Sequence, residues 1–197
     1  MAGVIKSGDS GNTARVFRNR LNVHSTAETE EVDALEDGDA YNINTGSISL
    51  AAATATLYLK NNEDKDLIIN ALVVGVGTPD GGNTNFTGET VIELIRNPTA
   101  GTLIDSTPTN TSINENRNFG STNTLSATTY QAGASGDAIS DGSTALYFFQ
   151  NGAGRLFAGI NILLPKGSSI GVRVTPAIDA TTLPVYTAFV CYLEQEH

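Results

Sequence analysis

Residues 146–193 read LYFFQNGAGRLFAGINILLPKGSSIGVRVTPAIDATTLPVYTAFVCYL, and this stretch decides the fold class. It contains several short apolar runs, each ended by Gly, Pro, Asn or Asp. Apolar runs of this length that are bounded by turn-forming residues are typical of β-strands. The stretch therefore predicts successive strands at residues 146–149, 157–164, 170–174 and 185–193.

The turn at Pro165–Ser168 is the clearest of these boundaries. Pro165 has a fixed φ and no N–H to donate, and Gly167 can adopt a positive φ, so a strand must end and reverse here. After the turn, apolar residues occupy every second position from Ile170 to Val174. This period of two residues indicates a strand with one buried and one exposed face.

The chain from Ala40 onward repeats the pattern, and we expect about eight to ten strands and no convincing helix. Residues 67–76 are apolar on both faces, which predicts a central strand covered on both sides. Residues 102–104 are interpreted as a short edge strand, and residues 105–123 as an irregular polar segment anchored by Phe119. The predicted fold class is all-β: an antiparallel β-sandwich of jelly-roll type with an extended N-terminal arm.

The sequence divides into an N-terminal arm, residues 1–39, and a β-sandwich (jelly-roll) domain, residues 40–197. The arm is basic in its first part and acidic in its second, and neither part has a sustained apolar period. Such a terminus is either a flexible tail or a segment that lies on another chain. We predict an extended or partner-docked arm, whose candidate partner-binding residues are the cations Lys6, Arg15, Arg18 and Arg20.

Composition narrows the classes of partner. The formal net charge is −10, and an acidic chain disfavours nucleic-acid binding, which requires clustered Lys and Arg. No apolar run approaches the length of a membrane span, and the N-terminus has no apolar secretory-signal region. We therefore expect no nucleic-acid partner, no membrane partner and synthesis in a cytoplasm.

Residues that could carry catalysis are few. The two histidines, His24 and His197, lie in the arm and at the last residue, so a Ser-His-Asp arrangement is not expected. The single cysteine, Cys191, alternates with apolar residues and is interpreted as a packing residue. We expect no enzyme activity, no metal site and no cofactor. Calcium held by Asp137 and Asp141, or by the acidic part of the arm, is the alternative that stays open.

Three turn motifs carry a resemblance to a known class of proteins. They are Asn97-Pro98-Thr99, Gly101-Thr102 and Asn116-Arg117-Asn118-Phe119-Gly120-Ser121, and the strand–Pro–Lys–Gly–Ser–strand unit of residues 164–174 follows them. In these motifs, residues 91–193 resemble structural proteins of tailed bacteriophages. The resemblance implies a virion component with a jelly-roll body, of the capsid decoration (cement) type or the head-fibre or tail accessory type.

From this resemblance we expect a virion structural protein, a capsid decoration protein anchored through its arm, that is assembled in the host cytoplasm. The expected partners are the major capsid protein or other virion proteins, and further copies of the chain as a homotrimer. The alternative is a receptor- or carbohydrate-binding module of a phage fibre or tail, which would use loops 77–88, 105–123 and 132–143. A glycan hydrolase is least expected, because Glu89 and Glu93 would lie about 13 Å apart along one strand, beyond the catalytic separation of about 5–9.5 Å.

Overall fold

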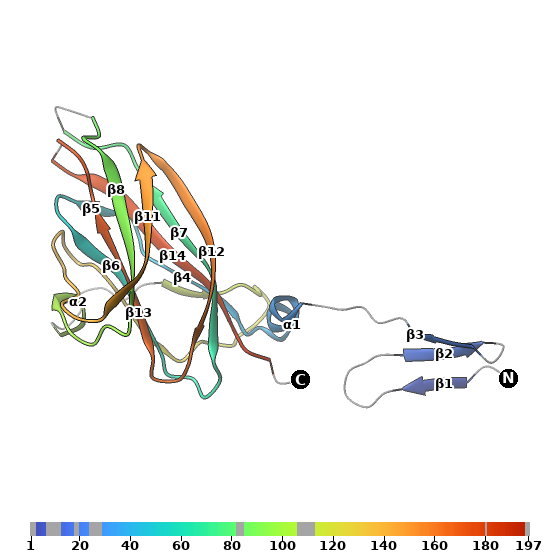
Figure 1. The fold of residues 1–197 in the computed structure, drawn as a ribbon. Helices are drawn as coiled ribbons and strands as arrows, with labels where there is room; N and C mark the ends of the chain where they lie inside the picture. Colours follow the sequence, from blue (N-terminus) through green and yellow to red (C-terminus); the bar gives the residue numbers. More distant parts are fainter. Residues whose placement is uncertain are drawn as a thin grey trace.

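The computed structural model describes residues 3–6, 13–17, 20–23, 29–81, 85–105, 113–179 and 181–195, the first three segments by their backbone alone. The main body is an antiparallel β-sandwich, which confirms the predicted fold class (Figure 1). Sheet I has the strand order β10–β6–β13–β8–β11, and sheet II has the order β12–β7–β14–β4–β9, with β5 also paired to β14. The two sheets pack face to face.

The strands predicted in the C-terminal stretch are all present. The strands of sheet I are β6 (Thr54–Asn61), β8 (Glu89–Arg96), β10 (Ala127–Gln131), β11 (Ser143–Asn151) and β13 (Ser169–Thr175). The strands of sheet II are β4 (Ala40–Asn44), β5 (Ile48–Leu50), β7 (Leu67–Val76), β9 (Ile113–Asn116), β12 (Gly154–Leu164) and β14 (Leu183–Leu193). Strand β9 corrects the prediction that residues 105–123 are irregular throughout, because it pairs with β4 over its whole length.

Four antiparallel pairs are nested along the chain: β5 with β14, β6 with β13, β7 with β12 and β8 with β11. Consecutive strands of this series lie in opposite sheets. The turn at Pro165–Ser168 forms as predicted, with the Ser168 N–H donating to the Pro165 carbonyl (3.0 Å) and Gly167 at φ 80°. It joins β12 in sheet II to β13 in sheet I, so the two strands that it connects do not pair with each other.

The core lies between the two sheets. Leu72 and Phe189 from sheet II and Ile92 from sheet I are fully buried within one cluster, and each such side chain stabilises the fold by about 1.5–3 kcal/mol. The hydroxyls of Thr56 and Thr187 hydrogen-bond across the core at 2.9 Å. This bond satisfies two buried polar groups that would otherwise weaken the packing of the sheets.

The outer faces of the two sheets differ. A segment over the outer face of sheet I includes the short helix α2 (Thr102–Asp105), whose Leu103 packs with Ile95 and Ile139. The prediction of an edge strand at residues 102–104 is therefore wrong, because burial of Leu103 favours a helical turn. On sheet II, Ile68 and Val73 of β7 face outward and are partly exposed. The prediction of a central strand at residues 67–76 is confirmed, because β7 pairs with both β12 and β14, but its outer face is only partly covered in the described part of the chain.

Helix α1 (Glu30–Asp37) corrects the prediction that the chain has no helix. Its first turn is acidic, which suits the positive end of the helix dipole. It ends at Gly38, whose φ of 79° lets the chain turn away while the Asp39 N–H donates to the Ala34 carbonyl (2.7 Å). Ala34 is fully buried and the helix contacts β4 and β14. Residues 29–39, assigned to the arm from sequence, therefore pack on the sandwich.

The rest of the predicted arm contains three strands, β1 (Gly3–Lys6), β2 (Thr13–Phe17) and β3 (Arg20–Val23). They pair with one another as a small antiparallel sheet in the order β1–β2–β3. Figure 1 shows this sheet apart from the sandwich, beyond helix α1. The sequence analysis did not predict these strands, and the expectation that the arm docks on a partner stays a prediction.

Candidate functional site

Helix α1 is fastened to the sandwich through its first turn. The Glu31 carboxylate accepts hydrogen bonds from Arg117 Nη1 (2.7 Å) and from Asn70 Nδ2 of β7 (2.7 Å). The Glu30 carboxylate accepts a bond from the backbone N–H of Gln195 (3.2 Å), just beyond β14. One turn of helix is thereby tied to three separate segments of the body.

Asparagine side chains hold the other end of α1. Asn118 Nδ2 donates to the carbonyls of Leu35 (3.1 Å) and Glu36 (3.2 Å). Asn123 Nδ2 donates to the Asp37 carbonyl (3.2 Å) and Asn116 Nδ2 to the Gly38 carbonyl (2.6 Å). The last carbonyls of a helix have no partner within the helix, so these amides fix its C-terminal end in place. We call α1 together with residues 116–123 the α1 junction.

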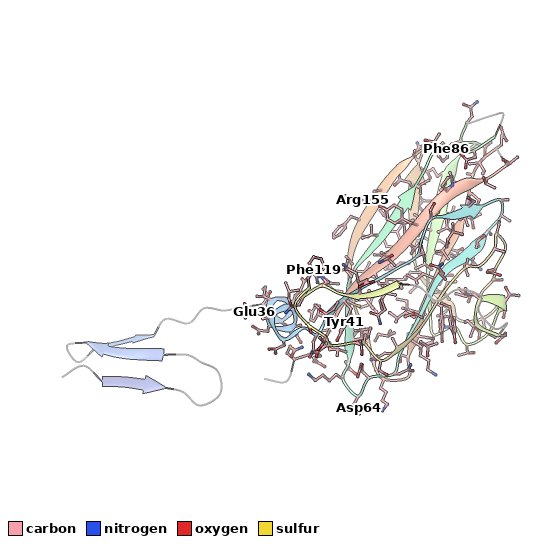
Figure 2. The ribbon with its side chains drawn as sticks, turned by 180° about the vertical axis from the view of Figure 1, so that it is seen from behind. Glu36, Tyr41, Asp64, Phe86, Phe119 and Arg155 are labelled. Atoms are coloured by element: carbon pink, nitrogen blue, oxygen red, sulfur yellow. The ribbon has the colours of Figure 1, made fainter. Side chains whose placement is uncertain are left out.

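The ring of Phe119 projects from the α1 junction into solvent. It is 99% exposed, and Figure 2 shows it near Glu36 of α1. The turn that carries it is rigidly bonded: the Asn118 N–H donates to Asn116 Oδ1 (2.8 Å), and the Gly120 N–H donates to Asn118 Oδ1 (3.0 Å). The prediction that Phe119 anchors its segment in the core is wrong. The ring therefore lies on the surface of the α1 junction, close to the helix.

Three of the four predicted partner-binding cations lie in the N-terminal sheet. Lys6, Arg15 and Arg20 lie in β1, β2 and β3, and the register of the three strands places all three positions on the same face of the sheet. The opposite face carries the apolar positions Ile5, Ala14, Val16, Leu21 and Val23, while Val4 and Phe17 share the face of the cations. Arg18 lies outside the described residues. The sequence analysis missed this apolar face because each strand is only four or five residues long.

Large apolar side chains are exposed on one edge strand of each sheet. They are Leu146, Tyr147 and Phe149 on β11, and Phe157 and Leu163 on β12. Tyr147 and Phe149 lie on the outer face of sheet I, and Phe157 and Leu163 on the outer face of sheet II. Figure 1 shows β11 and β12 joined at one end of the sandwich and separating from there. A pocket of about 390 Å³ opens where the two strands diverge, lined by Leu94, Ala145, Ile162 and Ile170 among others.

Glu93 and Cys191, which the sequence offers as reactive groups, have structural partners. Arg173 donates twice to Glu93, from Nε (2.6 Å) and Nη2 (2.7 Å), and these bonds hold the pKa of Glu93 below its ordinary value. Glu89 is exposed at the start of β8. Cys191 is fully buried, its Sγ donates weakly to the Tyr41 carbonyl (3.6 Å), and burial raises its pKa to about 12. Its interpretation as a packing residue is confirmed. His24 and His197 lie outside the described residues.

The two aspartates proposed as calcium ligands cap turns instead. Asp141 Oδ1 accepts the backbone N–H groups of Thr99 (2.8 Å) and Ala100 (2.9 Å), and the Thr99 hydroxyl bond is the main cause of its lowered pKa. Asp137 Oδ2 accepts the N–H groups of Gly133 (2.8 Å) and Ala134. In the described part of the chain, no group of three or more His, Cys, Asp or Glu residues could hold a metal ion.

The described residues of the loops that a receptor- or carbohydrate-binding module would use lie on different parts of the sandwich. Phe86 and Asp80 of loop 77–88 form bridges with Ile178 and Thr182 at one end of the sandwich. Loop 132–143 lies over the outer face of sheet I, where Ile139 is buried and the Ala55 N–H donates to the Asp137 carbonyl (2.7 Å). The third loop begins at Asp105 of α2, beside loop 132–143, where the Ala138 N–H donates to the Thr102 hydroxyl (2.7 Å), and its residues 116–123 are part of the α1 junction.

In comparisons with known proteins, no family model, no curated protein and no solved structure matches this chain. Neither helix in the described ranges has the length and hydrophobicity of a membrane span.

Proposed function

We propose that this protein is a structural component of a bacteriophage virion, of the capsid decoration type, that attaches through its N-terminal region and catalyses no reaction. Its proposed partners are the major capsid protein or other virion proteins and further copies of itself as a homotrimer. The nested pairs β5–β14, β6–β13, β7–β12 and β8–β11 support a jelly-roll description of the body, because a long hairpin rolled into two sheets produces this pairing.

The observation that carries the proposal is the α1 junction. A segment that only linked a loose tail to the body would need no fixed geometry. Here Glu31 is bonded to Arg117 and Asn70, and Asn118 is bonded to the far end of the helix. These bonds give the N-terminal sheet a fixed point of departure, beside the exposed ring of Phe119. A rigid connection at α1 suits an N-terminal region that holds the body at a fixed position on a surface.

The N-terminal sheet supports attachment to a partner in two ways. The face with Ile5, Val16 and Leu21 must pack against another surface, because a small sheet is stable in water only when its apolar face is packed. Its basic register positions, Lys6, Arg15 and Arg20, suit an acidic partner surface. Each exposed ion pair contributes only about 0–1 kcal/mol, so burial of the apolar face would supply most of the affinity.

Deletion of residues 2–28 tests the proposal while sparing α1. The full chain should co-sediment with shells assembled from the major capsid protein of the same genome. The deleted chain should keep the β-sheet circular dichroism of the parent and remain in the supernatant. A triple variant, Lys6→Ala with Arg15→Ala and Arg20→Ala, should bind about tenfold more weakly, since three exposed pairs are lost.

Lys166→Ala is the matched control, because Lys166 is an exposed cation of the body that pairs with Asp64. It should bind as the parent does. Full binding by the deleted chain would contradict attachment through the N-terminal region. A glycan-specific interaction of the full chain without shell binding would instead favour the receptor- or carbohydrate-binding alternative.

A further inference from the structure

We propose that the pocket between the diverging ends of β11 and β12 binds an amphipathic anion, an alkyl chain of medium length that ends in a carboxylate. The inference goes beyond the proposed function and does not depend on it, because it concerns a small ligand of the chain itself. The inner faces of two packed sheets interdigitate and leave few voids larger than a water molecule. Here a pocket of about 390 Å³ opens between them, within the range of about 300–1,000 Å³ for ligand sites.

The two sheets supply the walls of this pocket. Leu94 of β8 and Ile170 of β13 lie on the inner face of sheet I. Ile162 and Leu164 of β12 lie on the inner face of sheet II. The strand register breaks beside the pocket in both edge strands, at Ala145 in β11 and just before Ile162 in β12. A bulge bends the strand that carries it, so both edge strands change direction where the pocket opens.

The chemistry of the walls favours an aliphatic chain. Most of the described lining residues are aliphatic, and none of them is aromatic or acidic. Such walls offer no platform on which a nucleobase could stack, whereas an alkyl chain gains free energy from burial alone. At about 30 Å³ for a group the size of a water molecule, a pocket of about 390 Å³ holds about thirteen such groups. Decanoate, with about twelve non-hydrogen atoms, is a ligand of this size.

Arg96 supplies the positive charge for the carboxylate. It alternates with Ile92 and Leu94 along β8, so it lies on the inner face of sheet I at the end of the strand. Leu94 is fully buried and Arg96 is exposed, so the pocket runs inward from the guanidinium. Arg173 on the neighbouring strand is bound twice by Glu93, but no described residue forms an ion pair with Arg96. An unpaired guanidinium can bind a carboxylate through two parallel N–H donors.

Two neutral donors lie beside Arg96 among the lining residues. Asn97 Oδ1 accepts the backbone N–H of Ser169 (3.3 Å), which leaves Asn97 Nδ2 as a donor. The hydroxyl of Ser168 has no partner in the described part of the chain. The pocket thus combines one positive charge with neutral donors at its open side and aliphatic walls behind them. This arrangement matches a ligand with an anionic head and an apolar chain.

Isothermal titration of the full chain with decanoate, kept below its micelle-forming concentration, tests the proposal. One decanoate should bind per chain, and uncharged decanol should bind at least about tenfold more weakly, because it forms no charged hydrogen bond with Arg96. From hexanoate to decanoate, each added methylene should lower the dissociation constant about fourfold, as expected for burial of one CH₂ group. The gain should stop beyond about twelve carbons, when the pocket is full.

Three variants locate the site. Arg96→Gln should weaken decanoate binding about tenfold and leave decanol binding unchanged. Ala145→Phe should fill the pocket and abolish binding of both ligands. Arg155→Gln is the matched control, because Arg155 is an exposed arginine of β12 about 25 Å along the strand from Leu163, and no described residue pairs with it. It should bind decanoate as the parent does.

The chain-length series uses only the parent, so it keeps the test decisive if a variant does not fold. A parent without saturable one-to-one binding would overturn the inference, whether a neighbouring copy or the chain's own side chains close the pocket. Equal binding of decanol and decanoate would also overturn it. The same holds for affinity that keeps rising with chain length, or for full binding by the folded Arg96→Gln variant.

Discussion

Replacement of Asn118 by alanine should loosen helix α1 while leaving the sandwich intact. In the parent, the Asn118 amide donates to the carbonyls of Leu35 and Glu36 and its Oδ1 accepts the Gly120 N–H. Each bond contributes about 0.5–1.5 kcal/mol, and partial exposure of Asn118 places them at the low end of this range. The free energy of opening α1 should therefore fall by about 1–2 kcal/mol.

Hydrogen exchange measures this local change directly. A loss of about 1–2 kcal/mol corresponds to exchange about 5–30-fold faster in peptides covering residues 30–38, because opening of a local segment sets the rate. Peptides from β7 and β14 should exchange as in the parent, and the melting temperature should change little. If α1 is required for attachment, shell binding of Asn118→Ala should weaken in parallel.

Asn62→Ala provides the control for this experiment. Asn62 donates from Nδ2 to the Thr128 hydroxyl (3.0 Å) at an exposed site in a different loop. Its loss removes a similar amide bond but should leave exchange in α1 unchanged. Equal protection of residues 30–38 in the parent and in Asn118→Ala would refute the reasoning that the asparagine amides hold the helix.

Two further predictions concern the body. Arg173→Met should destabilise the fold by about 1–2 kcal/mol at pH 7. The loss is kept this small because Arg173 is partly exposed and solvent screens its charge. Arg173 lowers the folded-state pKa of Glu93, so the parent's gain is present above about pH 4.3 and is lost as the pH falls through that lowered pKa. The difference in melting temperature between the parent and the variant should therefore shrink on acidification, and a constant difference would contradict the ion-pair explanation. Gly101→Ala should lower the melting temperature by at least about 4 °C, because Gly101 has a φ of 131° and an added Cβ would lie 2.3 Å from the Ala138 carbonyl oxygen. Gly46→Ala, whose Cβ would meet nothing within 4 Å, should melt as the parent does.

The strands of the body could be predicted from sequence because their signals are local. Alternation from Ile170 to Val174 and the Pro165–Ser168 turn depend on neighbouring residues, and both appear in the structure. The helices could not be predicted in the same way. Helix α1 has eight residues, too few for helical propensity to decide, and it forms because Ala34 is buried against the sandwich and Arg117 reaches back to Glu31.

The candidate surfaces were also beyond the reach of the sequence. Apolar residues such as Phe119, Phe157 and Val73 are predicted to be buried, because hydrophobicity alone does not show whether another element packs over a side chain. The N-terminal cations could be named, but only the strand register places Lys6, Arg15 and Arg20 on one face. Exposure depends on which elements pack over a position, and those elements come from distant parts of the chain.

By itself, therefore, the sequence determined a two-layer β-protein with a single buried cysteine and a distinct, charged N-terminal region. Period-two hydrophobicity and turn residues act within a few positions, so no long-range contact is needed to read them. The tertiary structure decided how the strands divide between the sheets, that residues 29–39 belong to the body, and which aromatic rings face solvent. Each of these depends on contacts between residues far apart in the chain, such as Glu31 with Arg117 and β5 with β14.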